Sequence, residues 1–489
     1  MGEGETVERG RPDRLLSREE IARRDLGSTS VSIAQQVVLT GAFLATIFGV
    51  PAVQQARDIY AGFKGNCPSR WPQCTEIVRQ TTEAVQRFFD VEAGSGTVTR
   101  LFAANRVLLR GIPEYERRLE DHSLLQAALL PPAQAAMTRY LGVGNEEVYT
   151  GLGGWLFYRP GIDSLTGPGF LTGSTLAQRR RGGNEWRPPP QPDPVAAILQ
   201  FQAQLLERGI ELVLVPTPGK SCIYPQRFSR RYGGGRAPLH NSSYEQMLQE
   251  LRTPQVFFEG RFSDYAEVMR NPQEAERYGD ALAYLSTMRK QLEAHPVRVL
   301  DVSGDVSDAN GAAGTYLPTD THWSPDGMER AAAGLATFLR ESGVLPARPA
   351  VNYQTATASV QNDGDLVAML RLRHPERMFA KQEVTIRPVR SADGSRAWQP
   401  DHDADVLLLG DSFSNIFSDP GLRWGEGAGL AERLSYHLKR PVDAIRRNDE
   451  GAYATRHSLL RECAGGRDRL AGKAVVVWQF AARELAGGD

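Results

Sequence analysis

The chain has 489 residues, of which 41% are hydrophobic, so it is long enough for two or three domains and a sizeable core. Its formal net charge of −1 gives no support for nucleic-acid binding, because nucleic-acid-binding domains concentrate positive charge. We therefore expect a folded protein with no nucleic-acid partner.

A charge-free segment near the N-terminus predicts a membrane anchor. No charged residue occurs in Leu26–Ala56, and the apolar centre is Val37–Val53, near the lower length limit for a membrane-spanning helix. A cleavable signal peptide ending near Val50–Ala52 is the alternative, but the polar leader is long for one. We expect a cytoplasmic tail over residues 1–30 and an uncleaved transmembrane anchor over residues 31–56.

The arginines around this segment predict its orientation. Only Arg57, Lys64 and Arg70 follow it closely. The arginines that precede it are Arg9, Arg11, Arg14, Arg18, Arg23 and Arg24. Because positive charge is retained on the cytoplasmic side, we expect a single-pass protein of the inner (cytoplasmic) membrane. Its N-terminus would be cytoplasmic and the remainder periplasmic or otherwise extracytoplasmic.

Two cysteines close to the anchor predict a disulfide. Cys67 and Cys74 enclose a short loop that contains two prolines, as a disulfide formed in an oxidising compartment would. A metal site would need further cysteine or histidine partners nearby, and the sequence offers none. Cys222 and Cys463 are distant single cysteines, expected to be small buried residues, although a bond between them stays open.

The predicted secondary structure changes after Gly151. Residues 57–147 predict a helical spacer or cap, and beyond them short apolar runs alternate with helical ones. This alternation predicts a mostly parallel, three-layer α/β sheet structure. The predicted strands are Ile210–Val215, Val297–Val302, Asp405–Leu409, Val442–Ile445 and Ala474–Phe480. The predicted helices include Pro194–Arg208, Asp280–Ala294, Pro325–Arg340 and Gly429–Leu438.

An acid and a histidine precede one of these helices. Asp320 lies two residues before His322, so both side chains project to one side of an extended segment. Ser324 is a predicted N-cap and Pro325 the first helical residue, which puts His322 on a tight loop at the start of the helix. His402 has acidic neighbours too, but we expect it on the surface at the far end of the strand that leads to Ser412.

Ser412 follows Gly410-Asp411 directly after a strand that is apolar throughout. Ligands of open α/β sheets bind beyond the carboxyl ends of the strands, where unpaired backbone N–H groups converge. A serine hydroxyl becomes a nucleophile when an imidazole accepts its proton and an acid orients that imidazole. Asp320, His322 and Ser412 are therefore candidates for a triad, although Gly-Asp-Ser is also a common turn.

The motif D-x-H-W-S-P-D-G over residues 320–327, followed about 90 residues later by Gly-Asp-Ser, resembles the SGNH-like proteins of bacterial polysaccharide O-acetylation, the AlgJ and AlgX group. Ordinary SGNH hydrolases have the serine near the N-terminus, and this chain has the reverse order, as that group does. Weaker matches lie at 153–157, 215–218, Lys220, 224–225, 364–366 and 477–480. The resemblance implies an SGNH-hydrolase-like catalytic domain over residues 148–489.

The resemblance also implies a reaction. Ser412 would attack an acetyl donor with His322 as base and Asp320 as its support, and a hydroxyl of an exported polysaccharide would then take the acetyl group. The Ser412 amide is the expected oxyanion donor, and Asn448, Asn415 and Lys220 are further candidates for oxyanion or substrate contacts. No cofactor or metal is implied, and a membrane-bound O-acyltransferase would supply the acetyl group.

Other readings stay open at this point. A carbohydrate esterase would use the same triad with water as acceptor, and a polysaccharide-binding assembly protein would not use it at all. The basic runs Arg179–Arg181 and Arg227–Arg236 form either a solvated face or a rim that attracts an anionic polysaccharide.

Overall fold

The computed structural model describes residues 124–181, 191–232, 237–307, 314–448 and 451–487, together with short stretches between residues 33 and 109. The chain divides into two compact units, Met1–Leu130 and Pro131–Asp489. Helix α2 (Ile33–Leu44) lies within the predicted anchor. None of the helices in the described ranges has both the length and the apolar character to cross a membrane. Cys67 and Cys74 lie outside these ranges, so their pairing stays a prediction.

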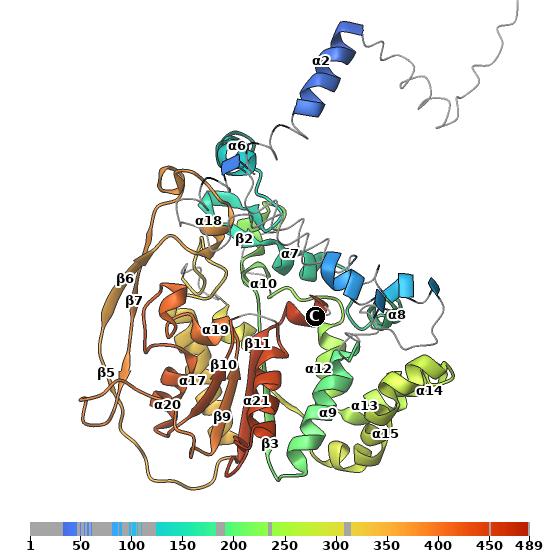
Figure 1. The fold of residues 1–489 in the computed structure, drawn as a ribbon. Helices are drawn as coiled ribbons and strands as arrows, with labels where there is room; N and C mark the ends of the chain where they lie inside the picture. The colour runs from blue at the N-terminus through green and yellow to red at the C-terminus, as the bar shows by residue number, and fades with distance from the viewer. Residues whose placement is uncertain are drawn as a thin grey trace, which may run out of the picture. The chain divides into compact units, whose positions relative to one another are not determined.

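A five-stranded sheet in the order β10-β9-β11-β3-β4 forms the centre of the second unit (Figure 1), and its pairings are all parallel. Its strands are β3 (Glu211–Thr217), β4 (Arg298–Val299), β9 (Val406–Gly410), β10 (Asp443–Arg446) and β11 (Val475–Ala481). All five predicted strands are present. Strand β4 is shorter than predicted because Asp301 accepts a hydrogen bond from the Ser303 amide and turns the chain into a helix.

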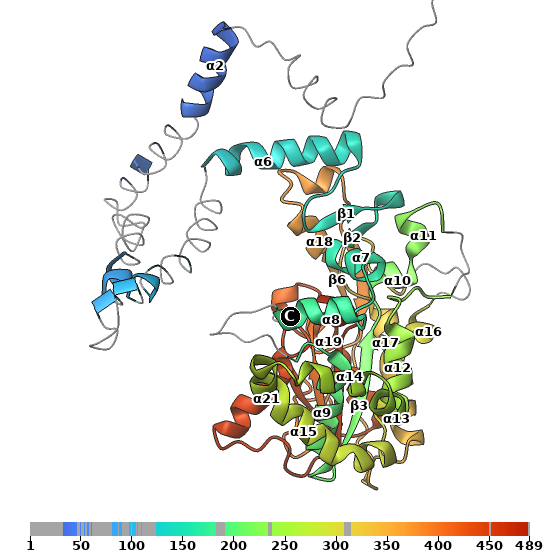
Figure 2. The ribbon, with the colours of Figure 1, turned by 90° about the vertical axis from the view of Figure 1, so that its right-hand side faces the viewer.

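Helices cover both faces of this sheet. Val213, Leu408 and Val477 belong to one buried cluster, whereas their neighbours Leu214 and Leu409 belong to the other. Each such side chain contributes about 1.5–3 kcal/mol when fully buried. The first cluster includes residues of α17 (Pro325–Glu341) and α20 (Leu430–Leu438). The second includes residues of α9 (Pro194–Leu206), α12 (Tyr244–Arg252), α15 (Pro272–Ala294) and α21 (Ala454–Ala464). Figure 2 shows the helices of the second cluster from the side of α9 and α15. The sheet thus has helices on both faces, which confirms the predicted three layers.

Two of these helices begin as the sequence predicts. The Asp193 carboxylate accepts a hydrogen bond from the Val195 amide at the start of α9, at 2.9 Å. The Ser324 hydroxyl accepts one from the Gly327 amide at the start of α17, at 3.2 Å. Because these caps satisfy amides that have no intrahelical partner, they fix where each helix starts. The start of α17 in turn fixes the loop that contains His322.

Three small antiparallel sheets were not predicted. They pair β1 (Val148–Thr150) with β2 (Leu156–Tyr158), β5 (Gln354–Thr355) with β8 (Val389–Arg390), and β6 (Ala358–Asn362) with β7 (Gln382–Ile386). Strands β6 and β7 alternate between exposed and partly buried positions and are rich in polar residues, so they lack the apolar runs that identify the central strands.

The remaining helices are short connections. They are α6 (Leu124–Ala136), α7 (Arg159–Thr166), α8 (Gly173–Arg181), α10 (Lys220–Ile223), α11 (Pro225–Phe228), α13 (Pro254–Glu259), α14 (Arg261–Val268), α16 (Ser303–Val306), α18 (Asp365–Met369), α19 (Ser412–Asn415) and α22 (Glu484–Gly487). A π-helical turn (Met137–Leu141) and 3₁₀ turns (Leu152–Gly154, Pro375–Arg377 and Pro420–Leu422) complete the described elements. Cys222 and Cys463 are free thiols, so a bond between them is excluded.

Candidate active site

Ser412 is the first residue of helix α19, immediately beyond the carboxyl end of β9. The Asp411 carboxylate caps this helix by accepting a hydrogen bond from the Phe413 amide at 2.9 Å. Gly410 is required at the end of the strand, because a Cβ there would lie 2.6 Å from the Cβ of Ser414. As the first helical residue, Ser412 has an amide without an intrahelical partner. This amide is therefore free of helix hydrogen bonding and stays a candidate oxyanion donor.

The loop that contains Asp320 and His322 is tied to the serine's helix. It closes on itself through a hydrogen bond from the Leu317 amide to the His322 carbonyl, at 3.1 Å. The indole N–H of the fully buried Trp323 donates to the Phe413 carbonyl at 3.0 Å. These contacts fix the imidazole beside the serine although 90 residues separate the two in sequence.

In the structure His322 lies between Asp320 and Ser412 and contacts both side chains. His322 Nε2 lies 2.8 Å from Ser412 Oγ, and His322 Nδ1 lies 2.7 Å from Asp320 Oδ1. Asp320 and His322 are buried, whereas Ser412 is partly exposed. Such an arrangement allows the imidazole to take the serine proton while the carboxylate holds its tautomer.

Both oxygens of Asp320 accept two hydrogen bonds each. Oδ1 accepts from the backbone amide and Nδ1 of His322, and Oδ2 accepts from the Asp365 amide at 3.0 Å and the Trp424 indole at 2.8 Å. Burial alone would raise the pKa of Asp320, but the hydrogen bond and charge of His322, together with the hydrogen bonds from the Trp424 indole and the Asp365 backbone amide, lower this pKa below its usual value. Asp320 is therefore an ionised partner for the imidazole at neutral pH.

The environment of His322 favours its protonated form. Burial lowers the pKa of His322, but the hydrogen bond and charge of Asp320, together with the charge of Asp365, outweigh burial and the opposing charge of Arg483 and raise this pKa. The Phe413 ring packs edge-on against the imidazole, with ring centres 4.9 Å apart. An imidazolium formed during acyl transfer would therefore be stabilised in place.

Asp365 is a second carboxylate at the site, and no role for it was predicted from the sequence. Its Oδ1 accepts a hydrogen bond from the Thr321 amide at 2.7 Å, and its Oδ2 lies 3.8 Å from His322 Nδ1. Gly364, with φ of 95°, allows this approach, because a Cβ there would lie 2.2 Å from the Thr319 carbonyl oxygen. The Gly364-Asp365 pair in the sequence was the only signal for this residue.

The ligand-type atoms of Asp320, His322 and Asp365 all lie within 4.8 Å of one another. The hydrogen bonds around Asp320 already use both of its oxygens and the Nδ1 of His322. Binding a metal ion here would require the break-up of the contact between His322 and Asp320.

Replacement of Asp365 by asparagine is expected to shift the pH profile of kcat/KM. The base must be neutral, so activity is lost as pH falls through the pKa of His322, which Asp365 helps to raise. Asp365→Asn removes that charge and keeps the backbone amide from which Asp320 accepts a hydrogen bond, so the acidic limb should move to lower pH. Glu259→Gln, an exposed acid on α13, is the control. An acidic limb at the same pH in the Asp365→Asn protein would refute this role.

Lys220 does not point to a substrate. Its ammonium, which is 4% exposed, donates to the carbonyls of Leu317, Pro318 and Asp320 at 3.0, 3.0 and 2.7 Å. These bonds use all three of its hydrogens. Burial lowers the pKa of Lys220 to about 7 against the opposing charges of Asp365 and Asp320. Lys220 therefore holds the loop that contains Asp320, which is a positioning role.

Asn415 and Asn448 lie together beyond the serine. The Asn415 side-chain amide donates to Asn448 Oδ1 at 2.8 Å, and that of Asn448 donates to Asp419 Oδ2 at 2.6 Å. Both residues thus belong to one hydrogen-bonded chain at the end of α19. Their contribution to an oxyanion or a substrate stays a prediction.

Gln479, on β11, supports the turn that presents Ser412. Its side chain is 1% exposed, accepts from the Asp411 amide at 3.2 Å, and donates to Asp411 Oδ1 at 2.9 Å and Thr217 Oγ1 at 3.0 Å. The Ser414 hydroxyl also donates to it. The other oxygen of Asp411 accepts from the Ala481 amide at 2.6 Å. The neighbouring strand therefore fixes the turn that precedes Ser412 through buried hydrogen bonds.

His402 is a surface residue, as the sequence predicts. Its side chain is 67% exposed, and its Nδ1 lies 3.1 Å from Asp443 Oδ1. It precedes β9, whereas Ser412 follows that strand. Its acidic neighbours in the sequence therefore do not make it part of the site.

A family profile described as "SGNH hydrolase-like domain, acetyltransferase AlgX" matches residues 148–278 and 261–482 of this chain. The chain is 28% identical over 318 residues to "Probable alginate O-acetylase AlgJ" of Pseudomonas aeruginosa, covering 62% of this chain and 67% of that protein. It is 23% identical over 300 residues to the Pseudomonas putida protein of the same name, covering 60% and 63%. The match thus spans about two thirds or less of the length of these curated relatives.

Two solved structures are similar in fold. The O-acetyltransferase domain of Pseudomonas putida AlgJ aligns with a TM-score of 0.44 and 20% identity, covering 69% of this chain and 92% of that domain. Pseudomonas aeruginosa AlgX aligns with a TM-score of 0.40 and 17% identity, covering 72% of this chain and 66% of that one.

Proposed function

This chain belongs to the AlgX and AlgJ family of SGNH hydrolase-like acetyltransferases, and we propose that it transfers acetyl groups to hydroxyls of an exported, alginate-type polysaccharide through an acetyl-serine on Ser412. The observation that supports this most is the continuous contact from Ser412 Oγ through His322 to Asp320, at 2.8 and 2.7 Å. It supplies a nucleophile, a base and an orienting acid at the carboxyl edge of the sheet.

In the first half-reaction, Ser412 Oγ attacks the acetyl carbonyl while His322 Nε2 takes the hydroxyl proton. The Ser412 amide stabilises the oxyanion, and ionised Asp320 stabilises the imidazolium. The imidazolium then returns the proton to the departing group, which leaves acetyl-Ser412. By family resemblance, the donor is supplied by a membrane-bound O-acyltransferase.

The second half-reaction reverses these roles. A sugar hydroxyl loses its proton to His322 Nε2 and attacks the acetyl ester, and Ser412 recovers the proton as the sugar ester leaves. Water in place of the sugar would give an esterase with the same triad, so the acceptor distinguishes the two activities. A transferase must hold the sugar hydroxyl as a near-attack nucleophile and keep water less well placed.

The partition of acetyl between sugar and water tests this proposal. The purified protein is given an activated acetyl ester together with unacetylated oligouronates, and products are followed by mass spectrometry. Acetylated sugar should form faster than free acetate, and Ser412→Ala should abolish both products. Free acetate as the sole product across a panel of acceptors would establish the esterase, and no serine-dependent turnover would establish a binding protein.

We further propose that the catalytic unit is extracytoplasmic, because the charge-free segment Leu26–Ala56 follows an arginine-rich flank. Alkaline phosphatase fused after Asp489 should then be active, since that reporter requires export. Moving six arginines of the flank to the opposite side of the segment is the matched control and should reduce this activity. High activity of a cytoplasmic reporter at the same fusion point would reject this topology.

A further inference from the structure

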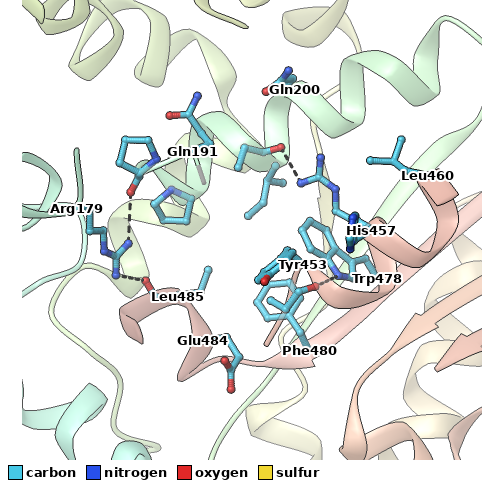
Figure 3. A pocket seen from close by; sticks show the side chains of 16 residues that line it. Arg179, Gln191, Gln200, Tyr453, His457, Leu460, Trp478, Phe480, Glu484 and Leu485 are labelled. Carbon is cyan, nitrogen blue, oxygen red and sulfur yellow. Dashed lines mark hydrogen bonds between the residues drawn. The ribbon is translucent and has the colours of Figure 1, made fainter. Parts of the chain in front are cut away.

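A pocket lies among α9, α21, α22 and β11 (Figure 3), and none of the triad residues lines it. Its volume is about 310 Å³, at the lower end of the range of roughly 300–1,000 Å³ for small-molecule sites. Its lining includes the apolar residues Pro192, Ile198, Leu460 and Leu485, together with Phe480 of β11. Phe480 lies next to Gln479 in β11, so the pocket and the catalytic turn share one strand.

Arg456 is a positively charged residue that lines this pocket. Its guanidinium lies 4.5 Å from the centre of the Phe201 ring and 5.1 Å from that of Trp478, and it donates a hydrogen bond to the Ala197 carbonyl at 3.5 Å. No carboxylate in the described part of the chain pairs with it, and burial lowers the pKa of Arg456 to about 10. An apolar setting makes such a charge costly unless an anion accompanies it.

Two other arginines of the protein are paired with carboxylates. Arg261 contacts Asp193 and Glu250, and Arg440 contacts Asp405 at 2.6 Å. Arg261 also lies over an aromatic ring, 5.4 Å from the centre of Phe257, so stacking on a ring does not replace a carboxylate there. Among the described residues Arg456 therefore lacks the carboxylate partner that Arg261 and Arg440 have, and a bound anion would supply one.

The rest of the pocket selects the chemical class of that ligand. Arg179 donates to the carbonyls of Pro192 and Leu485, and Glu484 lies 3.1 Å from Arg483, so the acid on the rim is already partnered. Most of the surface that lines the pocket is apolar, although Gln191, Gln200, Tyr453 and His457 also contribute polar side chains, whereas a sugar needs hydrogen-bonding groups along its whole length. A ligand with an apolar body and a single carboxylate matches both the walls and Arg456.

We propose that this pocket binds a small amphiphilic carboxylate, whose carboxylate pairs with Arg456 and whose apolar body lies against Ile198, Leu460 and Leu485. The inference is independent of the proposed acetyl transfer, because it involves none of the triad residues. Decanoate below its micelle concentration is a suitable probe, and decanol is its neutral counterpart of equal chain length.

Isothermal titration calorimetry of the full chain with these probes tests the proposal. Decanoate should bind with one site per chain, and decanol at least tenfold more weakly, because a charge-assisted hydrogen bond is lost. Arg456→Gln should weaken decanoate by a similar factor. Arg289→Gln is the matched control, since Arg289 also lies over a ring, that of Phe258, but pairs with Glu293.

A second variant tests the pocket independently, in case Arg456→Gln does not fold. Leu460 is 60% exposed at the rim, so Leu460→Glu should fold normally and still weaken decanoate by repulsion and lost apolar contact. Equal affinity for decanoate and decanol, or binding unchanged in both variants, would overturn the proposal. Tighter binding of an oligouronate than of decanoate, sensitive to Arg456→Gln, would overturn the assigned ligand class.

Discussion

Ser412→Ala and His322→Ala are each expected to lower turnover of p-nitrophenyl acetate by at least ~10³-fold, because members of a triad act as a unit. The 2.8 Å contact between His322 Nε2 and Ser412 Oγ makes either residue ineffective without the other. For the same reason, the double variant should be no slower than the slower single variant. Steady-state rates of purified proteins measure this effect.

His402→Ala is the control for general loss of a histidine, since His402 is exposed and precedes the strand that Ser412 follows. It should retain turnover close to that of the unmodified protein. Residual activity above about a tenth in Ser412→Ala, with unchanged thermal stability, would mean that another group is the nucleophile.

Asp320→Asn is expected to reduce turnover by ~10³–10⁴-fold, close to the effect known for this change in a serine triad. The side-chain oxygens of Asp320 accept from His322 on one side and from Trp424 and the Asp365 amide on the other. Asparagine has one acceptor and one donor end. If its NH₂ group faces His322, the imidazole takes the wrong tautomer. If its NH₂ group faces Trp424, the Trp424 indole and the Asp365 amide, which are both donors, lose their acceptor.

Either orientation should also destabilise the fold by about 1–3 kcal/mol, because a buried hydrogen-bonding group loses its partner. Thermal unfolding and kcat measured on the same samples separate the two effects. Asp403→Asn, at an exposed position before β9, should change neither. An Asp320→Asn protein that keeps a tenth of the turnover would show that the imidazole does not depend on this carboxylate.

The central sheet is predictable from sequence because its strands are buried on both faces. Such strands appear as nearly continuous apolar runs, as in Val406–Gly410, where every residue is buried. The hairpin of β6 and β7 is not predictable in this way, since residues such as Ser359 and Glu383 make its surface polar. After β4 the Asp301 side chain accepts a hydrogen bond from the Ser303 amide, a local turn that periodicity cannot reveal.

The triad is predictable because its residues occur in short motifs with local structural meaning. Asp320 and His322 share one extended loop, and Ser412 follows a strand. The supporting residues Asp365, Trp424 and Gln479 are not predictable, because their contacts join segments that lie 45, 104 and 68 residues apart.

Lys220 illustrates the limit of reasoning from residue type. A lysine at the exit of a strand suggests a substrate contact, but its three donors end on backbone carbonyls. A polar residue next to a site therefore has to be traced to its partners before it is given a chemical role. The anchor and the Cys67–Cys74 disulfide stay predictions from sequence.

The most direct test of the account is rapid-quench peptide mass spectrometry of the protein mixed with an activated acetyl ester. The account predicts an acetyl group on the peptide that contains Ser412, and its transfer to an oligouronate when that acceptor is added in a chase. An acetyl group on a different residue would contradict this prediction. Turnover without an acetylated peptide in any acid-quenched sample would contradict it too.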